Sequence, residues 1–163
     1  MGETLGEGGY AKVRLCTRKK DHEVLVMKIF PKFKLTTEDK KKAVSKEVEI
    51  MKCIKHPSII KIVDFFETND NFNIVMEHFS TTSLTEFAKN HRPISDSTMR
   101  SIVKQLAEAI AYLHKMRIAH RDIKPDNILI NEQNQIKIID LGLSMMGEQS
   151  EVKVAGTPYY MAP

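Results

Sequence analysis

One short run of residues constrains the fold of this chain most: Val24-Leu-Val-Met-Lys-Ile-Phe30. Its length and apolar content are typical of a strand buried in a sheet, and Pro31 ends it. Lys28 nevertheless stands inside the run, where an ammonium group without a partner would be strongly destabilising. A carboxylate is therefore needed nearby, and Glu47 is the candidate on an apolar helical face. The alternative is an edge strand from which Lys28 reaches solvent.

The helix that carries Glu47 is predicted to follow this strand. Thr36 with Asp39 resembles a capping box in which Asp replaces the usual Glu or Gln. The helix stops at His56-Pro57. Apolar residues recur at helical spacing beside Glu47, namely Val44, Val48, Met51 and Ile54.

The chain divides into a strand-rich half and a helical half, separated by the candidate linker Ser80-Thr-Thr-Ser83. Short strands are predicted at residues 5–9, 13–15, 59–66 and 72–77, and again at 127–130 and 135–139. Ser95 is expected to cap a long amphipathic helix that ends near Met116. Residues 141–163 form a polar stretch without a convincing helix. The helix has an apolar stripe that we expect to be core: Met99, Ile102, Val103, Leu106, Ile110 and Leu113.

Composition excludes several classes of protein. A chain of 163 residues is one domain or part of one, and no apolar run approaches the ~20 residues of a membrane span. Its acidic, glycine-rich start is unlike a secretory signal. Two cysteines, Cys16 and Cys53, can form neither a disulfide framework nor a four-ligand zinc site, which favours a cytoplasmic or nuclear protein. The net charge of +4 and Lys40-Lys-Lys42 would permit nucleic-acid binding, but a solvated helix face is the favoured interpretation.

A glycine-rich turn, Gly6-Glu-Gly8-Gly9-Tyr-Ala11-Lys-Val13, connects the first two predicted strands. Glycine allows backbone N–H groups to approach phosphate oxygens without an intervening side chain. Because a strand rather than a helix follows, the dinucleotide-binding fingerprint is disfavoured. Taken alone, the turn equally fits an ordinary hairpin.

The strongest motif is His120-Arg-Asp122-Ile-Lys124-Pro-Asp-Asn127, which is followed by Asp140-Leu-Gly142. In residue type and order, these segments resemble the catalytic loop and metal-binding triplet of eukaryotic protein kinases, and the glycine-rich turn resembles their nucleotide loop, with Ala11 replacing its third glycine. Lys124 and the segment beginning Gly156-Thr157-Pro-Tyr-Tyr are typical of the serine/threonine kinases. The resemblance implies an α+β, bilobal fold. Residues 1–79 would be the small lobe with its hinge, its first strand clipped, and residues 80–163 part of a helical large lobe whose later helices are missing.

The resemblance implies ATP and Mg as cofactors, and Ser or Thr hydroxyls of proteins as substrates. Asp122 would orient the hydroxyl and accept its proton, and Lys124 would stabilise the transferred phosphoryl group. Lys28, held by Glu47, would offer its charge to the α- and β-phosphates. The metal ligands would be Asn127 and Asp140.

The nucleotide contacts follow from the same resemblance. Glu77 to Phe79 would be the hinge, Met76 would guard the pocket behind ATP, and Val26 would narrow the adenine slot where alanine is usual. Met51, Ile62, His120 and Leu141 would stack as the regulatory spine. The nucleotide-binding set is Leu5, Gly6, Glu7, Gly8, Gly9, Val13, Val26, Lys28, Met76, Glu77, Phe79 and Leu129.

Regulation is also indicated by the resemblance. Kinases with an arginine at the position of Arg121 often use a phosphorylated loop residue to satisfy its charge. The usual position of that residue is occupied by Lys153, so we expect activation without phosphorylation there. Thr157 is expected to be a structural hydroxyl near Asp122 and Lys124. The remaining candidates are Ser144 and Ser150 for phosphorylation, and Glu148 or Glu151 for standing negative charge.

Asp140-Leu-Gly-Leu-Ser144 and Gly156-Thr-Pro-Tyr-Tyr160 resemble the calcium/calmodulin-dependent group, including its calcium-dependent relatives. Any such calcium input would act through segments outside this chain. The alternative to a kinase is a non-catalytic nucleotide-binding or scaffold module, in effect a pseudokinase. Neither a nucleic acid nor a membrane is expected as a partner. Because the resemblance covers only part of the kinase domain, we expect the isolated chain to fold poorly or to be nearly inactive.

Overall fold

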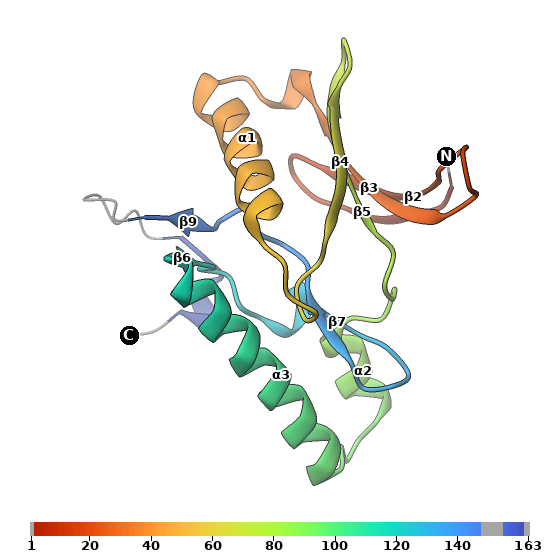
Figure 1. Ribbon diagram of the computed structural model, residues 1–163, viewed down its shortest axis with the longest axis vertical. Helices are drawn as coiled ribbons and strands as arrows, with labels where there is room; N and C mark the ends of the chain where they lie inside the picture. Colours follow the sequence, from red (N-terminus) through yellow and green to blue (C-terminus); the bar gives the residue numbers. More distant parts are fainter. Residues whose placement is uncertain (1, 148–154, 162–163) are drawn as a thin grey trace. The chain divides into compact units, whose positions relative to one another are not determined.

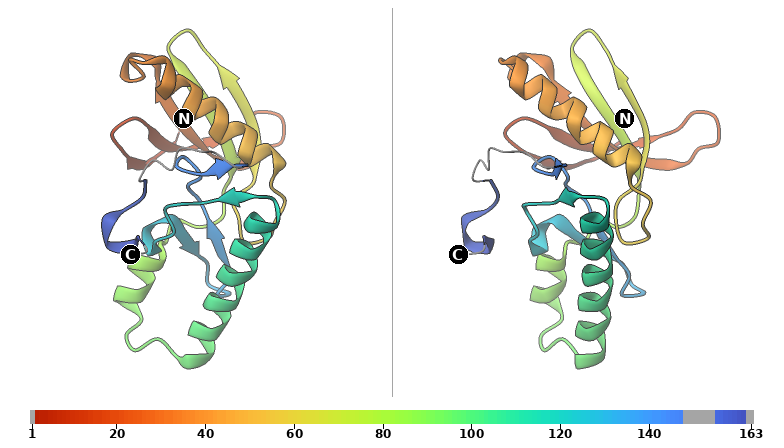
Figure 2. Two further views of the ribbon diagram at one scale, coloured as in Figure 1. Left: turned by 90° about the vertical axis from the view of Figure 1, so that its left-hand side faces the viewer. Right: turned by 60° about the vertical axis from the view of Figure 1, so that its left-hand side comes forward.

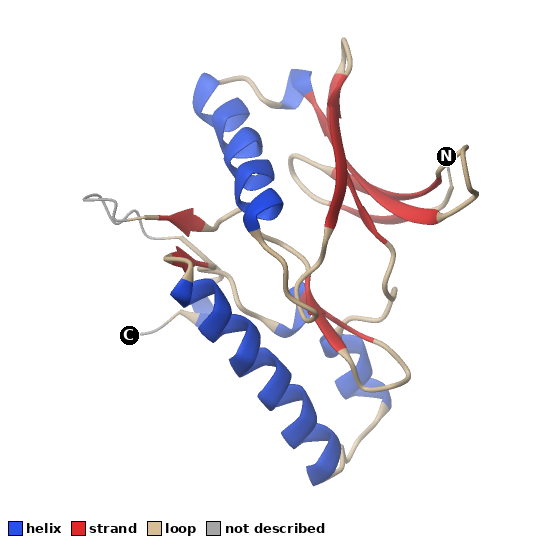
Figure 3. Cartoon of the chain, viewed as in Figure 1, coloured by secondary structure: helices blue, strands red, loops and turns tan. Residues whose placement is uncertain are grey.

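The computed structural model describes residues 2–147 and 155–161. The chain forms two compact units. The first comprises Met1–Cys53 with Lys61–His78, and the second comprises Ile54–Ile60 with Phe79–Pro163. Strands dominate the first unit, and the longest helix lies in the second (Figure 3).

The first unit is built on a five-stranded antiparallel sheet in the order β1-β2-β3-β5-β4 (Figure 1). Its strands are β1 (Thr4–Glu7), β2 (Lys12–Thr17), β3 (Val24–Pro31), β4 (Ile62–Glu67) and β5 (Asn71–Glu77). The predicted buried strand is β3. Because β3 pairs with β2 on one side and β5 on the other, the edge-strand interpretation of Lys28 is wrong.

The helix α1 (Glu38–Cys53) follows β3 after a short 3-10 turn, η1 (Lys32–Lys34). It begins one residue later than a capping box at Thr36 would require. The Lys40 N–H donates to the Thr37 hydroxyl at 3.4 Å, so Thr37 takes the capping position. The predicted apolar face is confirmed within the helix, where Val44, Val48 and Met51 are buried together with Glu47.

The strand predicted at residues 59–66 is shorter in the structure, because its first residues belong to the second unit. Ile59 forms a parallel bridge with Ile138, and the Ile60 N–H donates to the Ile138 carbonyl at 2.9 Å. Because Ile59 and Ile60 make these contacts, they are not part of the sheet of the first unit, and β4 begins at Ile62.

The second unit contains α2 (Leu84–Asn90), α3 (Asp96–Lys115) and two short antiparallel strand pairs. One pair is β7 (Ile128–Ile130) with β8 (Ile136–Ile138), and the other is β6 (Ile118–Ala119) with β9 (Met145–Met146). Two 3-10 turns complete it, η2 (Pro125–Asn127) and η3 (Pro158–Tyr160). The sequence did not predict α2, β6 or β9.

Serine caps begin both helices of this unit. The hydroxyl of Ser95 accepts the Thr98 N–H at 3.2 Å, which confirms the predicted cap of α3. Ser83, the last residue of the predicted linker, caps α2 in the same way by accepting the Glu86 N–H at 3.2 Å. The polar segment that was interpreted as a linker is therefore partly a helix start.

The core of the second unit lies where α2 and α3, which are joined by the loop at the bottom of both views in Figure 2, meet the β7–β8 pair. Only part of the predicted α3 stripe is buried. Met99 and Val103 are 44% and 55% exposed, so the prediction that the whole stripe is core is wrong for these two residues. The residues that form the core cluster are Ile102, Ile128, Ile130 and Ile136, with Leu84, Phe87 and Leu106 packed against them. Among the described residues, no helix combines the length and apolar character needed to cross a lipid bilayer.

Candidate active site

The central strand of the first unit carries the predicted ion pair. Nζ of Lys28 on β3 lies 2.7 Å from Oε1 of Glu47 on α1. The two side chains are only 15% and 5% exposed. Burial of this depth makes the pair important for stability, because removing either partner takes a charge–charge contact away from a group in a poorly solvated place. The structure therefore brings together the lysine and carboxylate that the sequence pairs.

The glycine-rich turn connects β1 to β2 and closes with a hydrogen bond from the Gly8 N–H to the Ala11 carbonyl, 2.8 Å long. A Cβ atom added at Gly6 or Gly9 would meet no other atom within 4 Å. Packing within the chain therefore does not require glycine at these two positions. Space beside a backbone is what the close approach of a ligand would need.

The remaining nucleotide-binding candidates are distributed over both units. Val26 on β3 is paired with Met76 on β5, and Glu77 accepts the Lys61 N–H at 2.8 Å. Val13 is the partner of Lys28 across β2 and β3, and Leu5 and Glu7 lie on β1. In the second unit, the Phe79 ring lies 5.5 Å from Nζ of Lys137, and Leu129 on β7 forms a bridge with Ser83.

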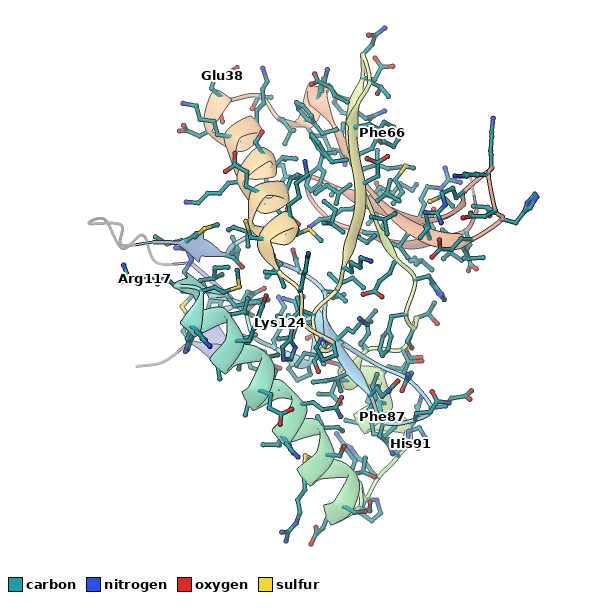
Figure 4. The ribbon with its side chains drawn as sticks, viewed as in Figure 1. Glu38, Phe66, Phe87, His91, Arg117 and Lys124 are labelled. Carbon is teal, nitrogen blue, oxygen red and sulfur yellow. The ribbon has the colours of Figure 1, made fainter. Side chains whose placement is uncertain are left out.

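Asp122 is the hub of the second unit's polar residues. Its Oδ1 accepts hydrogen bonds from the Thr157 hydroxyl (2.7 Å) and the Thr157 N–H (2.9 Å). Its Oδ2 accepts the Asn127 amide at 2.8 Å and lies 3.0 Å from Nζ of Lys124. Lys124, labelled in Figure 4, also donates to the Thr157 hydroxyl at 2.7 Å. The expected position of Thr157 beside Asp122 and Lys124 is confirmed.

This network decides the protonation state of Asp122. Burial by itself would raise the pKa of the carboxyl, but hydrogen bonds from Thr157, Lys124 and Asn127 and the positive charge of Lys124 outweigh burial. The pKa of Asp122 consequently lies below its ordinary value, and the group is a carboxylate at neutral pH. The Thr157 hydroxyl has one proton, which it gives to Asp122 while accepting from Lys124, so the three groups satisfy one another.

The side chains of Asn127 and Asp140 both offer oxygen atoms, the donors that a hard cation such as Mg prefers. The Asn127 side chain is buried, and its amide nitrogen donates to both the Asp122 carbonyl and carboxylate, so its side-chain oxygen is left as the acceptor. Oδ1 of Asp140 accepts the Gly142 N–H at 3.1 Å. The part of the chain that the structure describes contains no group of three or more His, Cys, Asp or Glu residues arranged for a metal. One carboxylate and one amide oxygen nevertheless fit Mg, which in phosphate sites takes one or two protein ligands and completes its shell with phosphate and water.

His120 contacts the backbone of the segment that carries Asp122. Its Nδ1 accepts the Asp122 N–H at 3.2 Å, which places the ring proton on Nε2. Nε2 is buried and has no hydrogen-bond partner in the described structure. Burial lowers the pKa of His120, although the charges of Asp140 and Asp122 act in the opposite direction. The imidazole is therefore neutral at physiological pH.

Two backbone features fix the segment around Thr157. Arg121 adopts a positive φ of 68°, and its Nε donates to the Leu143 carbonyl at 2.7 Å. Gly156 has a φ of 121°, and a Cβ atom there would lie 2.4 Å from the Arg121 carbonyl oxygen. Only glycine permits this approach. The sequence motif that contains Gly156 does not by itself indicate this geometric requirement.

The residues with a predicted regulatory role differ in their burial. Ser144 is buried and its hydroxyl donates to the His120 carbonyl at 3.4 Å, which makes it a poor target for modification in this conformation. Three of the proposed spine residues, Met51, His120 and Leu141, are buried, and Ile62 is half-buried. Four residues with a predicted regulatory role lie outside the described part of the chain: Glu148, Ser150, Glu151 and Lys153.

The antiparallel sheet with its buried lysine–glutamate pair, and the hub formed by Asp122, Lys124 and Thr157, have the residue types of the protein kinase motifs. A family profile described as "Protein kinase domain" matches residues 1–163. The chain therefore belongs to the protein kinase family, and several of its relatives are named as serine/threonine-protein kinases.

Three curated relatives illustrate the similarity. The chain is 35% identical over 165 residues to NUAK family SNF1-like kinase 1 of Homo sapiens, covering 100% of this chain and 25% of the relative. It is 39% identical over 168 residues to the probable serine/threonine-protein kinase fhkC of Dictyostelium discoideum, covering 100% and 28%. It is 31% identical over 168 residues to CBL-interacting protein kinase 33 of Oryza sativa subsp. japonica, covering 100% and 37%. The chain thus spans between about a quarter and two fifths of the relatives' lengths.

Proposed function

We propose that the protein containing this chain is an ATP-dependent serine/threonine protein kinase, which transfers the γ-phosphoryl group of ATP to Ser or Thr hydroxyls of proteins. The observation that carries the proposal is the Asp122 hub. A carboxylate held by Thr157, Lys124 and Asn127 is oriented by four hydrogen bonds or ion pairs of 3.0 Å or less. Such preorganisation is the main contribution a protein can make to phosphoryl transfer.

Asp122 has the role of orienting the substrate hydroxyl and receiving its proton. A carboxylate whose pKa lies below its ordinary value is a weak base, and it does not ionise a free hydroxyl. In a loose transition state, however, the hydroxyl becomes acidic as its oxygen bonds to phosphorus. Asp122 therefore accepts a hydrogen bond first and takes the proton late, before releasing it to solvent. Lys124, 3.0 Å from Asp122, supplies positive charge for the phosphoryl oxygens.

ATP and Mg are the cofactors of this proposal. Bound Mg would supply positive charge that offsets the negative charge of the phosphates. Asn127 and Asp140 would hold it through their side-chain oxygens. Lys28, positioned by Glu47, would contribute its charge to the phosphates, and the open backbone at Gly6 and Gly9 gives the N–H groups of the turn access to them.

The experiment is a phosphotransfer assay with radiolabelled ATP, Mg and a generic Ser/Thr-containing protein. In the protein that contains this chain, we expect turnover by the wild type and a loss of at least about 100-fold in the Asp122→Asn variant. Asp70→Asn, a matched change on the exposed turn between β4 and β5, is the control and should retain full activity. Nucleotide binding without any transfer by wild type would instead support a non-catalytic nucleotide-binding module.

A further inference from the structure

The basic segment at residues 32–46 contains six lysines and two carboxylates, and the proposed function uses none of them. The structure shows that several of these lysines contact the chain's own side chains. Lys32 pairs with Glu67 at 2.6 Å, and Lys41 pairs with Glu38, labelled at the first turn of α1 in Figure 4, at 2.8 Å. Two others, Lys34 and Lys40, contact side chains of the glycine-rich turn, and Nζ of Lys40 also lies 3.5 Å from the Thr36 hydroxyl.

Lys40 contacts the tip of the turn. Its Nζ lies 4.7 Å from the centroid of the Tyr10 ring, within the range of a cation–π interaction. Tyr10 is otherwise an exposed aromatic residue between Gly9 and Ala11, a position where packing against the core cannot hold it. Lys34 adds a weaker contact at the start of the turn, where its Nζ lies 3.9 Å from Oε1 of Glu7.

The same helix therefore reaches two parts of the first unit. Lys40 and Glu47 are separated by about two helical turns, so they project from the same face of α1. Val44, between them, is buried and fixes that face against the sheet. Through Glu47 the face holds Lys28, and through Lys40 it holds the Tyr10 ring.

We infer that Lys40 is a positioning residue, which holds the glycine-rich turn through the Tyr10 ring and so prepares it for the phosphates of a nucleotide. This inference rests on the proposed function. The physical reason is that a glycine-rich turn has unusual backbone freedom, which must be lost when it orders over a ligand. A contact that restricts the turn beforehand reduces the entropy lost on binding.

The test measures the affinity of each variant for a fluorescent ATP analogue with Mg. Lys40→Ala and Tyr10→Leu should each weaken binding by about 2- to 5-fold, the value of an exposed cation–π contact. The double variant should be no weaker than either single one, because both remove one interaction. Lys40→Arg and Tyr10→Phe keep a cation and a ring, and should bind as the wild type does. Lys42→Ala, an exposed lysine of the same helix, is the matched control.

A second measurement does not depend on the nucleotide. Hydrogen exchange of the backbone amides in residues 6–11, without ligand, should be faster in Lys40→Ala than in wild type and unchanged in Lys42→Ala. Equal exchange and equal affinity in the Lys40 and Lys42 variants would overturn the inference while leaving the proposed function intact. If wild type bound no nucleotide, the proposed function would fail. Unchanged exchange in Lys40→Ala would then also overturn the inference that Lys40 holds the glycine-rich turn.

Discussion

The most informative single change is Thr157→Val, which removes one hydroxyl from the Asp122 hub and nearly preserves the shape of the side chain. The hydroxyl donates to Asp122 at 2.7 Å and accepts from Lys124 at 2.7 Å. The backbone N–H of residue 157, which donates to Asp122 at 2.9 Å, is retained in the variant. The change therefore tests the hydroxyl and not the position of the backbone.

The expected magnitude follows from the burial of its partners. A hydrogen bond to a charged group contributes about 1.5–3 kcal/mol. The side chains of Asp122 and Lys124 are 11% and 22% exposed, so water can replace only part of what valine removes. If the hydroxyl orients Asp122 for transfer, kcat/KM should fall by about 10- to 100-fold, while the KM for ATP changes little.

The same substitution has a consequence for protonation. The Thr157 hydrogen bond is one of the groups that lower the pKa of Asp122 against the opposing effect of burial, so its loss should move that pKa upward. Carboxyl-carbon NMR of Asp122 during an acid titration would show this directly. Steady-state phosphotransfer at neutral pH gives the kinetic comparison.

Thr157→Ser is the matched control for both measurements, because it retains the hydroxyl. We expect its kcat/KM to lie within about 3-fold of wild type. Equal rates in the valine and serine variants, with equal denaturation midpoints, would refute the reasoning that the hydroxyl positions Asp122.

Three further predictions concern stability and local geometry. Glu47→Gln should lower the free energy of unfolding, measured in urea, by about 1–3 kcal/mol, because Lys28 keeps its charge in a poorly solvated place. Glu49→Gln, on the exposed side of α1, should change it by less than about 0.5 kcal/mol. Similar losses in both variants would contradict the importance of the pair. His120→Asn should flatten the pH dependence of the free energy of unfolding. Because burial lowers the pKa of the imidazole in the folded protein, wild type is fully stable above about pH 6.5 and loses stability as the pH falls toward the folded-state pKa. Parallel stability curves for the two proteins between about pH 5 and 7 would argue against this. Gly156→Ala should reduce kcat by about 10-fold or more with little change in global stability, since an added Cβ would lie 2.4 Å from a backbone oxygen. A phosphotransfer assay and a urea denaturation curve measure the two effects. Normal turnover would show that the backbone around residue 156 can shift to accommodate the Cβ atom.

Much of the fold could be predicted from local patterns. The apolar run of β3 and the helical spacing of α1 both placed their elements within a residue or two. Ser95 was recognised as a cap because a cap acts on its own next turn, which makes it a local signal. Elements with weak local signals were missed, above all α2, which is only seven residues long, and the two-residue strands β6 and β9.

The errors have a common physical cause, which is that sequence periodicity does not say what lies opposite a face. Met99 and Val103 continue the apolar stripe of α3, yet no described element covers them. Ile59 and Ile60 have the residue types of a strand, but they pair with Ile138 and so belong to another unit. The edge-strand alternative for Lys28 was rejected by the pairing of β3 on both sides, which no local pattern reports.

By itself, the sequence determined the chemistry of this protein: which residues carry charge, their order, and the need of Lys28 for an anionic partner. These follow from residue type and spacing, since a buried ammonium must be paired wherever it lies. Tertiary structure decided how these groups meet, including contacts that residue spacing alone did not predict. It joined Thr157 to Asp122 across 35 residues, required glycine at position 156 by the approach of the Arg121 carbonyl, and turned one face of α1 toward both Lys28 and Tyr10. The reason is that hydrogen bonds and ion pairs depend on distances of about 3 Å, which only the folded chain sets between residues far apart in sequence.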